Sequence, residues 1–207
     1  MILRTSTIAC DPRRLAERLP WLRVSVVPQL AALPGNVGVL VLVGEQAGRV
    51  VVASLWGTPT RMAADEPVLD ALREQACAVP GTTVTTESWE VVERHRRRPL
   101  AVGATDRSTR IEFPPADVDL LVETFRSTTL PATDLLPMLC GTTLLVDRSR
   151  GVAVWSATFT SHSAMTRSRR AAAEIRQMSM EKARARPVEV TELTVAIAEA
   201  ATRDGRG

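Results

Sequence analysis

The sequence predicts an α+β protein made of two copies of one unit, each spanning about half of the 207 residues. The chain matches itself at an offset of 103 positions, without a gap, from about residue 4 to residue 76. Prolines, glycines and the apolar strand pattern recur in this single register, and these residues fix backbone geometry and burial. Within each copy, the periodicity predicts the order β-α-β-β-α-β. Matching pairs include Arg4 and Arg107, Ile8 and Ile111, Pro28 and Pro131, Gly48 and Gly151, and Met62 and Met165.

The first copy opens with a strand and a helix. Residues 2–9 alternate and are rich in β-branched side chains, which is typical of a strand. Asp11 and Pro12 are suited to the cap and the first position of the helix that follows. Because Pro20 and Pro28 interrupt this helical stretch, it should form two pieces or one kinked element.

A β-hairpin is expected next, because apolar runs at 37–43 and 49–56 flank a turn that contains Gly48. Thr58 and the proline after it then start a second helix, and a strand over 83–92 completes the copy. The second copy repeats these elements, with a helix start at 114–117, strands at 142–147 and 152–159, a helix from about 160 to 185, and a strand at 188–197.

Each copy therefore has the ferredoxin-like arrangement, in which helices cover one face of an antiparallel four-stranded sheet. The copies are expected at 1–94 and 107–198, with a linker at 95–106 and a tail at 199–207. Since the other sheet face must also be covered, the two sheets should pack on each other or close into one barrel. The chain would then be an intramolecular pseudo-dimer and a monomer, with a homodimer as the alternative.

Composition indicates a well-packed globular protein, with 45% apolar and 24% charged residues. The sequence has no apolar run of transmembrane length and no signal-peptide pattern, so we expect a cytoplasmic protein that contacts no membrane. Cys10, Cys77 and Cys140 form no Cys-x-x-Cys pair and should be buried free thiols. The basic run 94–98 lacks aromatic or motif support for nucleic-acid binding and is expected to be a solvated linker.

Several of these features resemble one known family. They are Ala-Leu-Pro-Gly at 32–35, a hairpin with Gly48 in its turn, a strand ending at Trp56, the helix start at Thr58, and a last strand at 85–92. In this order the first copy is similar to the antibiotic biosynthesis monooxygenase domain of the dimeric α+β barrel superfamily. The second copy follows it through Leu136-Pro137, Gly151, Trp155 and Met165, so the resemblance is to a tandem repeat of that domain.

The resemblance implies a pocket between the sheet and the helices of each copy. Some family members oxidise polyketide-type aromatic substrates without metal or flavin, and related members degrade haem. The cofactor-free reaction uses a deprotonated phenolic substrate in a water-poor cavity with hydrogen-bond donors. We therefore expect a monooxygenase of secondary metabolism that acts on an aromatic molecule without a cofactor. The alternative is a non-catalytic tandem barrel that binds a small apolar ligand or serves as an interaction module.

The candidate catalytic residues are Trp56, whose indole could serve as wall and donor, and Ser54. Trp56 could equally fill the core. Alternation places Val52, Ser54 and Trp56 on one sheet face, where the second copy has Trp155, an alanine and Phe159. If only one pocket is active, it should be in the first copy, because the second lacks both the indole donor and the hydroxyl. The candidate substrate-binding residues are Val52, Trp89, Arg73, Arg4, Trp155 and Phe159, with the two arginines suited to hold a phenolate.

The chain departs from the family at several positions. The cofactor-free oxidases use an asparagine on the strand that leads to the tryptophan, whereas the single asparagine here, Asn36, is expected in a turn. The two histidines, His95 and His162, fall in the expected linker and at a helix start, so haem degradation and a metal site are not expected. Sequence signatures for phosphate loops, dinucleotide binding, serine hydrolysis and zinc proteolysis are missing.

Overall fold

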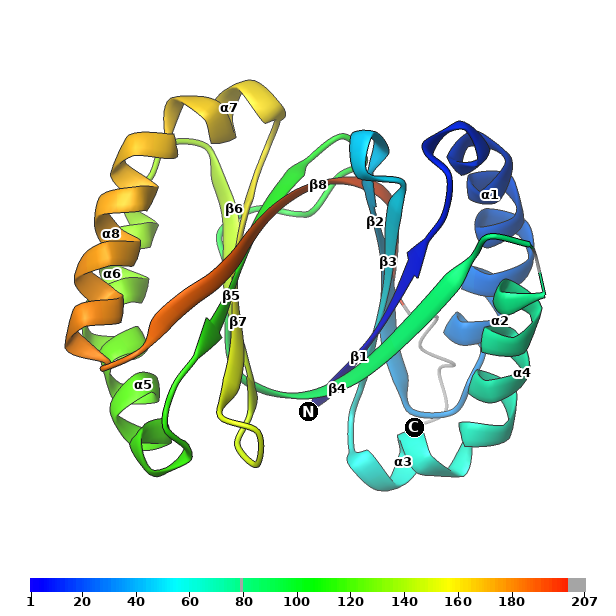
Figure 1. The fold of residues 1–207 in the computed structure, drawn as a ribbon, viewed down its shortest axis with the longest axis horizontal. Helices are drawn as coiled ribbons and strands as arrows, with labels where there is room; N and C mark the ends of the chain where they lie inside the picture. The colour runs from blue at the N-terminus through cyan, green and yellow to red at the C-terminus, as the bar shows by residue number, and fades with distance from the viewer. Residues whose placement is uncertain (79, 201–207) are drawn as a thin grey trace, which may run out of the picture. The chain divides into compact units, whose positions relative to one another are not determined.

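A computed structural model describes residues 1–78 and 80–200 (Figure 1). The chain divides into two compact units, Met1–Ser88 together with the chain from Val195 onward, and Trp89–Thr194. We call these unit 1 and unit 2. In each unit, helices cover one face of an antiparallel sheet, which gives an α+β architecture (Figure 1).

Unit 1 is built on three strands that pair in the order β1, β3, β2. The strand β3 pairs antiparallel with both neighbours, so that Val52 lies opposite Ser6 of β1 and Val41 of β2. The strands are β1 (Ile2–Ala9), β2 (Asn36–Gly44), β3 (Arg49–Trp56) and the first part of β4 (Thr83–Arg96); the helices are α1 (Leu15–Trp21), α2 (Val27–Ala31), α3 (Pro59–Ala64) and α4 (Glu66–Cys77). The predicted first strand and the predicted hairpin are therefore confirmed.

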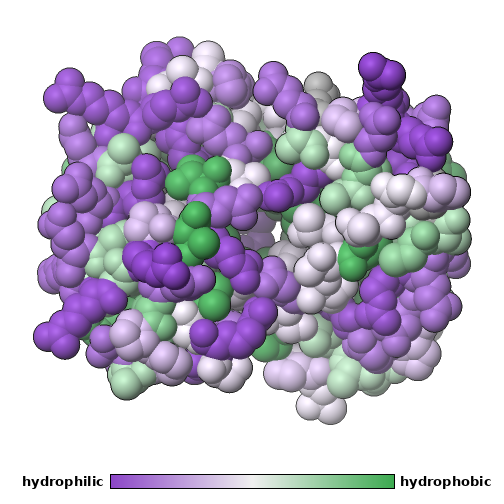
Figure 2. Space-filling model, viewed as in Figure 1, coloured by the Kyte–Doolittle hydropathy of each residue, from purple (hydrophilic) through white to green (hydrophobic). Residues whose placement is uncertain are grey.

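Unit 2 has the same order of elements. The strand β7 pairs antiparallel with β5 and β6, and Trp155 lies opposite Thr109 of β5 and Leu144 of β6. Its strands are β5 (Thr105–Glu112), β6 (Leu139–Asp147), β7 (Val152–Phe159) and the first part of β8 (Arg186–Ala200); its helices are α5 (Val118–Thr124), α6 (Leu130–Asp134), α7 (His162–Arg167) and α8 (Arg169–Lys182). Hydrophilic side chains line the exposed side of α8, at the left of Figure 2.

The strands β4 and β8 each belong to both units. β4 starts in unit 1 and ends in unit 2, and β8 starts in unit 2 and ends in unit 1. The strand order is β1-β3-β2-β8-β5-β7-β6-β4, which is the closed pairing order of an eight-stranded antiparallel barrel.

The expected linker, 95–106, differs from the structure at both ends. His95 and Arg96 are in β4, because they pair with Thr142 and Gly141 of β6, and Thr105 already starts β5. The Nε2 atom of His95 also lies 3.0 Å from Asp134 Oδ1. Of the expected tail, 199–207, the first two residues belong to β8 and the residues from 201 lie outside the described part of the chain.

The helical stretch after β1 is continuous in spite of its two prolines. Its middle, Leu22–Val26, is wound as a π-helix between α1 and α2, and unit 2 repeats this at Phe125–Thr129. A π turn absorbs the backbone disturbance that Pro28 causes, since proline removes a donor from the helix ladder. The sequence therefore predicted the disturbance, and the structure resolves it as a local change of winding.

Two glycines fix corresponding turns. Gly48 has a φ of +58°, and a Cβ there would lie 2.0 Å from the carbonyl oxygen of Cys10. Gly151 has a φ of +62°, and a Cβ there would lie 2.3 Å from the carbonyl oxygen of Phe113. Both positions require glycine, because the backbone is left-handed and a strand end approaches closely.

Each unit has its own core between the sheet and its helices. Trp56 belongs to the core of unit 1 and Phe159 to that of unit 2, and both side chains are fully buried. Within the described part of the chain, no helix is both long enough and apolar enough to cross a membrane.

Candidate functional site

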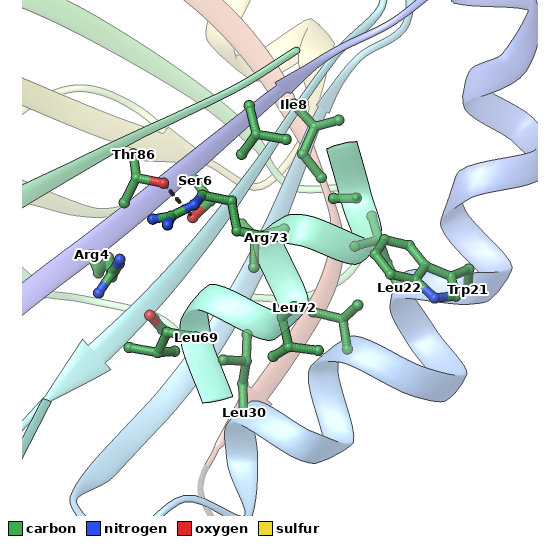
Figure 3. A pocket seen from close by; sticks show the side chains of 15 residues that line it. Arg4, Ser6, Ile8, Trp21, Leu22, Leu30, Leu69, Leu72, Arg73 and Thr86 are labelled. Atoms are coloured by element: carbon green, nitrogen blue, oxygen red, sulfur yellow. Dashed lines mark hydrogen bonds between the residues drawn. The ribbon is translucent and has the colours of Figure 1, made fainter. Parts of the chain in front are cut away.

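A cavity opens in unit 1 between the sheet and the helices (Figure 3). It has a volume of about 50 Å³. Its apolar wall comes from the helical stretch α1 to α2, from α4, and from residues of β1, β3 and β4. These apolar residues are Ile8, Trp21, Leu22, Val26, Leu30, Val52, Leu69, Leu72, Ala76 and Val84.

The remaining wall of the cavity is polar. It consists of the Arg4 and Arg73 guanidinium groups and the hydroxyls of Ser6, Ser54 and Thr86. Ser6 Oγ lies 3.4 Å from Thr86 Oγ1, and Figure 3 shows the Arg73 side chain directed toward this pair. Among the described residues that line the cavity, none carries a carboxylate. The polar wall therefore favours an anionic group.

The two arginines of this wall differ in burial and in how they bind their carboxylate partners. Arg4 is buried and binds Glu66 through both terminal nitrogens, with Nη2 2.8 Å from Glu66 Oε1. The hydrogen bond from Arg4 holds the pKa of Glu66 below its usual value. Arg73 has a side chain that is 38% exposed and lies with Nη2 2.8 Å from Asp70 Oδ1. Arg73 is thus the more accessible cation.

Trp56 lies behind the cavity wall, and its side chain is not part of the lining. Its Nε1–H donates a hydrogen bond of 3.0 Å to Ser54 Oγ. A serine oxygen that accepts one hydrogen bond still has its own hydrogen to donate. Ser54 is therefore the group of this pair that can reach a ligand in the cavity.

The corresponding region of unit 2 is filled. A cavity of only about 10 Å³ remains there, which is close to the volume of one water sphere. Trp155 and Phe125 border it, and Trp155 Nε1–H donates to Thr142 Oγ1 at 3.0 Å. Six residues of its lining are register mates of residues that line the unit 1 cavity, namely Ile111, Thr124, Phe125, Thr129, Trp155 and Ser179.

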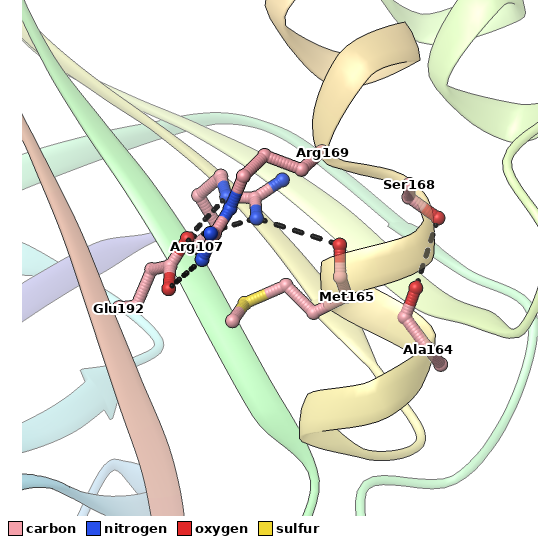
Figure 4. A network of polar contacts seen from close by, with 6 residues as sticks. All are labelled: Arg107, Ala164, Met165, Ser168, Arg169 and Glu192. Carbon is pink, nitrogen blue, oxygen red and sulfur yellow. Dashed lines mark hydrogen bonds and ion pairs between the residues drawn. The ribbon is translucent and has the colours of Figure 1, made fainter.

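Arg107, the register mate of Arg4, is held in an internal network (Figure 4). Its Nη2 lies 2.8 Å from Glu192 Oε1 and 3.4 Å from the carbonyl oxygen of Met165. Arg169 Nη2 approaches Glu192 Oε2 at 2.9 Å. Burial acts to raise the pKa of Glu192, but the hydrogen bonds and charges of the two arginines outweigh it and the pKa falls. Arg176, the mate of Arg73, has a lowered pKa because of burial and the charge of Arg107.

Unit 2 also contains a buried carboxyl group where unit 1 has Leu3. Asp106 accepts hydrogen bonds from the hydroxyls of Ser108 at 2.6 Å, of Thr158 at 2.7 Å, and of Ser156. Burial raises the pKa of Asp106 above its ordinary value, although these hydrogen bonds act to lower it.

The structure divides the predicted site residues between the two units. Arg4, Val52, Ser54 and Arg73 line the unit 1 cavity, and Trp56 lies directly behind it. The other three predicted residues are Trp89, Trp155 and Phe159, all of which belong to unit 2.

Trp89 is buried among residues of unit 2, away from the cavity lining. The guanidinium carbons of Arg110 and Arg150 lie 5.5 Å and 5.7 Å from the centre of its ring. It is on β4 beyond the point where this strand passes from unit 1 to unit 2, and no local sequence pattern indicates that crossing.

Sequence reasoning missed the helical side of the cavity. Trp21, Leu22, Leu69 and Leu72 line it, and the 3.6-residue periodicity of their helices could have indicated an inward face. The alternation of Arg4, Ser6 and Ile8 along β1 was a similar signal for the strand side.

The described residues contain no group of three or more histidine, cysteine, aspartate or glutamate side chains that could hold a metal ion. All three cysteines are free, as expected. Cys140 is buried and Cys10 is half-buried, but Cys77 is exposed at the end of α4, so the expectation of a buried thiol was wrong there.

Comparison with known proteins gives relatives in sequence and in fold. No family model matches the chain. Rv2557, an uncharacterised protein of Mycobacterium tuberculosis, is 33% identical over 195 residues, which cover 94% of this chain and 87% of that protein.

Two solved structures show the likeness in fold. An anthrone oxidase-like protein superposes with a TM-score of 0.68 at 12% identity, covering 98% of this chain and 94% of its own. An uncharacterised ferredoxin-fold protein of Listeria monocytogenes, related to antibiotic biosynthesis monooxygenases, has a TM-score of 0.51 at 10% identity and covers 95% of this chain and 96% of its own. The chain therefore belongs to one family with Rv2557, and it shares its fold with an anthrone oxidase-like protein and with a ferredoxin-fold protein related to antibiotic biosynthesis monooxygenases.

Proposed function

We propose that unit 1 binds a small aromatic molecule that carries an oxygen anion and oxidises it with O₂, without a resident metal or flavin. The observation that carries this proposal is the cavity of about 50 Å³, apolar on its helical side and lined by two guanidinium groups and three hydroxyls on the other. Such a cavity excludes water from a ring and offers positive charge to a phenolate or enolate.

The arginines activate the substrate by favouring its deprotonated form. A nearby guanidinium favours the charged form of an acid, so Arg73 lowers the pKa of a bound phenol or enol and holds its anion. The electron-rich anion gives an electron to O₂, and recombination forms a carbon–oxygen bond. Loss of water from the resulting peroxide leaves a carbonyl, so that a substrate CH₂ and O₂ become C=O and H₂O. Ser54, with its remaining hydrogen, is placed to stabilise the developing oxyanion.

The comparisons support the reaction class. One protein of the same fold is described as anthrone oxidase-like, and an anthrone is an aromatic ketone with an acidic CH₂ group. A role in secondary metabolism is part of the proposal for the same reason.

A second candidate function is ligand binding without catalysis. The observation that favours it is the hydrogen bond from Trp56 to Ser54, because an indole whose N–H is already donated within the wall cannot donate it to a substrate. The chain would then be a tandem barrel that binds a small apolar molecule or serves as an interaction module.

We further propose that the two units are copies of one ferredoxin-like domain and form an internal pseudo-dimer. Their equal order of elements and the corresponding turns at Gly48 and Gly151 support this. Because the order of the described strands is closed, no sheet edge needs a second chain, which favours a monomer. A cytoplasmic protein that contacts no nucleic acid or membrane is part of the same proposal.

The test measures oxygen consumption by the purified protein with a panel of phenols, quinols and anthrones after treatment with a metal chelator. Arg73→Gln should lower the rate at least about tenfold, since it removes a charged hydrogen-bond donor from the anion. Arg176→Gln, the matched change in unit 2, should leave the rate unchanged.

Other results of this experiment would reject oxidation or a site confined to unit 1. A ligand that binds in calorimetry without oxygen consumption supports the second candidate and rejects oxidation. Equal loss of activity in the two arginine variants contradicts a site confined to unit 1. Trp56→Phe separates the candidates further, because it removes the donor to Ser54 and should lower the oxidation rate more than ligand affinity.

A further inference from the structure

In unit 1, the arginine of the first strand and the arginine of α4 each have a carboxylate partner. Arg4 binds Glu66 through both terminal nitrogens. Arg73 pairs with Asp70, with Nη2 2.8 Å from Oδ1. Two negative charges therefore offset the two positive charges in this part of unit 1.

The matching positions of unit 2 carry neither carboxylate. At the offset of 103 residues, Arg169 stands in place of Glu66. Ala173 stands in place of Asp70. Glu192 of β8 supplies one carboxylate instead, and it pairs with Arg169 as well as with the arginine of the first strand. This part of unit 2 thus contains an additional cation and one carboxylate fewer than unit 1.

The first-strand arginine of unit 2, Arg107, is buried and has a nitrogen without an acceptor. Its Nε and Nη2 donate to Glu192 Oε1 at 3.0 Å and 2.8 Å, and Nη2 also lies 3.4 Å from the carbonyl oxygen of Met165 (Figure 4). Its Nη1 is buried and has no hydrogen-bond partner among the described residues. The same atom of Arg4 binds Glu66 in unit 1. The nitrogen that lacks a partner is thus the one whose carboxylate is replaced by an arginine in unit 2.

We infer that unit 2 holds a structural oxyanion, a phosphate or a carboxylate, beside Arg107 Nη1, in the role that the Glu66 carboxylate has in unit 1. Arg176 adds positive charge to this site. Burial, together with the charge of Arg107, lowers the pKa of Arg176, so the two guanidinium groups lie close enough to repel each other. Among the described residues, none forms an ion pair with Arg176. The site is independent of the oxidation proposed for unit 1.

An oxyanion satisfies this site better than a water molecule does. Nη1 of a guanidinium group carries two hydrogens, and a water molecule would accept one of them without offsetting any charge. An oxyanion accepts both and also reduces the repulsion between Arg107 and Arg176. The side chain of Arg169, next to the same carboxylate, is 59% exposed, so the network borders solvent on that side.

The experiment measures the binding of inorganic phosphate and of acetate by calorimetry, with chloride keeping the ionic strength constant. We expect saturable binding of at least one of them at millimolar concentration, and the tighter of the two identifies a tetrahedral or a planar anion. The midpoint temperature of unfolding should rise along the same saturation curve, because a ligand of the folded state stabilises it by mass action. Arg176→Gln should weaken binding at least about tenfold, since it removes a charged hydrogen-bond donor.

Two further variants locate the anion. Arg169→Glu restores the carboxylate that unit 1 has at this position, so it should bind neither anion and should unfold at the same temperature with and without them. Arg73→Gln is the matched control in unit 1 and should leave the binding measured in unit 2 unchanged.

Four results would overturn the inference. They are no saturable binding by the wild type, a loss of binding in Arg73→Gln rather than in Arg176→Gln, undiminished binding by Arg169→Glu, and a stabilisation that rises without saturation and equally in every variant. The last of these would show a general effect of salt on stability. Because none of these measurements uses oxygen consumption, failure of the anion site leaves the oxidation proposed for unit 1 to its own test.

Discussion

Unit 1 and unit 2 share their strand registers and differ in what lies between sheet and helices. Val52 borders a cavity of about 50 Å³, whereas Trp155 at the matching position leaves about 10 Å³. The backbone is set by glycines, prolines and strand alternation, which the two units have in common. The comparison shows that strands of one register can enclose interiors that are filled to different degrees.

The arginines of the first strands show a second difference. Arg4 takes its carboxylate from α4, through Glu66, whereas Arg107 takes its carboxylate from β8, through Glu192. The matching position to Glu66 carries Arg169, which joins the same Glu192. Unit 2 therefore pairs Arg107 and Arg169 with one carboxylate, while Arg73 of unit 1 lines the cavity. A binding role fits unit 1 and a structural role fits unit 2.

The largest loss of stability should come from removing a large side chain from the core of unit 2. Trp155→Ala removes a buried ring and its hydrogen bond to Thr142, and should destabilise the protein by about 3–5 kcal/mol. Val52→Ala, the matched change beside an existing cavity, should cost less than half as much. Urea denaturation followed by circular dichroism measures both, and equal costs would show that the two interiors are packed alike.

Smaller losses of stability are expected when the glutamates that pair with these arginines are replaced, and the loss should differ between the two. Glu192→Gln leaves two arginines without their shared carboxylate, one of them buried, and should cost about 1–2 kcal/mol. Glu66→Gln should cost under about 1 kcal/mol, because the Glu66 side chain is 41% exposed and solvent screens the pair.

The pH dependence of stability in Glu192→Gln and Glu66→Gln tests whether the two glutamates stabilise the fold through their charge. The pKa of each glutamate is lowered in the folded protein, so its stabilisation is present above the ordinary value of 4.5 and is lost as the pH falls through the lowered pKa. The cost of both substitutions should therefore shrink in acid. A cost that stays constant down to the acid transition would mean that charge is not what the glutamates contribute.

The smallest effect concerns Asp106, for which unit 1 has no equivalent carboxyl. Its pKa is raised by burial, so its contribution to stability is complete below the ordinary value of 3.8 and is lost as the pH rises through the raised pKa. Asp106→Asn cannot ionise, so its stability should gain on that of the wild type as the pH rises above the ordinary value of 3.8. Leu3→Asn is the matched control in unit 1, and the same trend there would rule out Asp106 as the titrating group.

The sequence by itself determined the local elements and the α+β fold class. The alternation of residues 2–9, the hairpin around Gly48 and the cap at Thr58 all depend on neighbours in the chain, and each is present in the structure. The resemblance to the antibiotic biosynthesis monooxygenase domain rested on those same features, and the fold comparisons confirm the fold that it implies. Turn geometry and strand alternation are local properties, so sequence is sufficient to predict them.

Only the tertiary structure decided which side chains share a site. Strand alternation placed Val52, Ser54 and Trp56 on one face, but the cavity takes the first two and leaves the indole behind the wall, bound to Ser54. Trp89 belongs to unit 2, because β4 continues from one unit into the other. No local sequence pattern indicates this crossing. Cavities and ion pairs depend on side chains far apart in sequence, such as Arg4 and Glu66, and their volumes and partners are fixed only when the chain is packed.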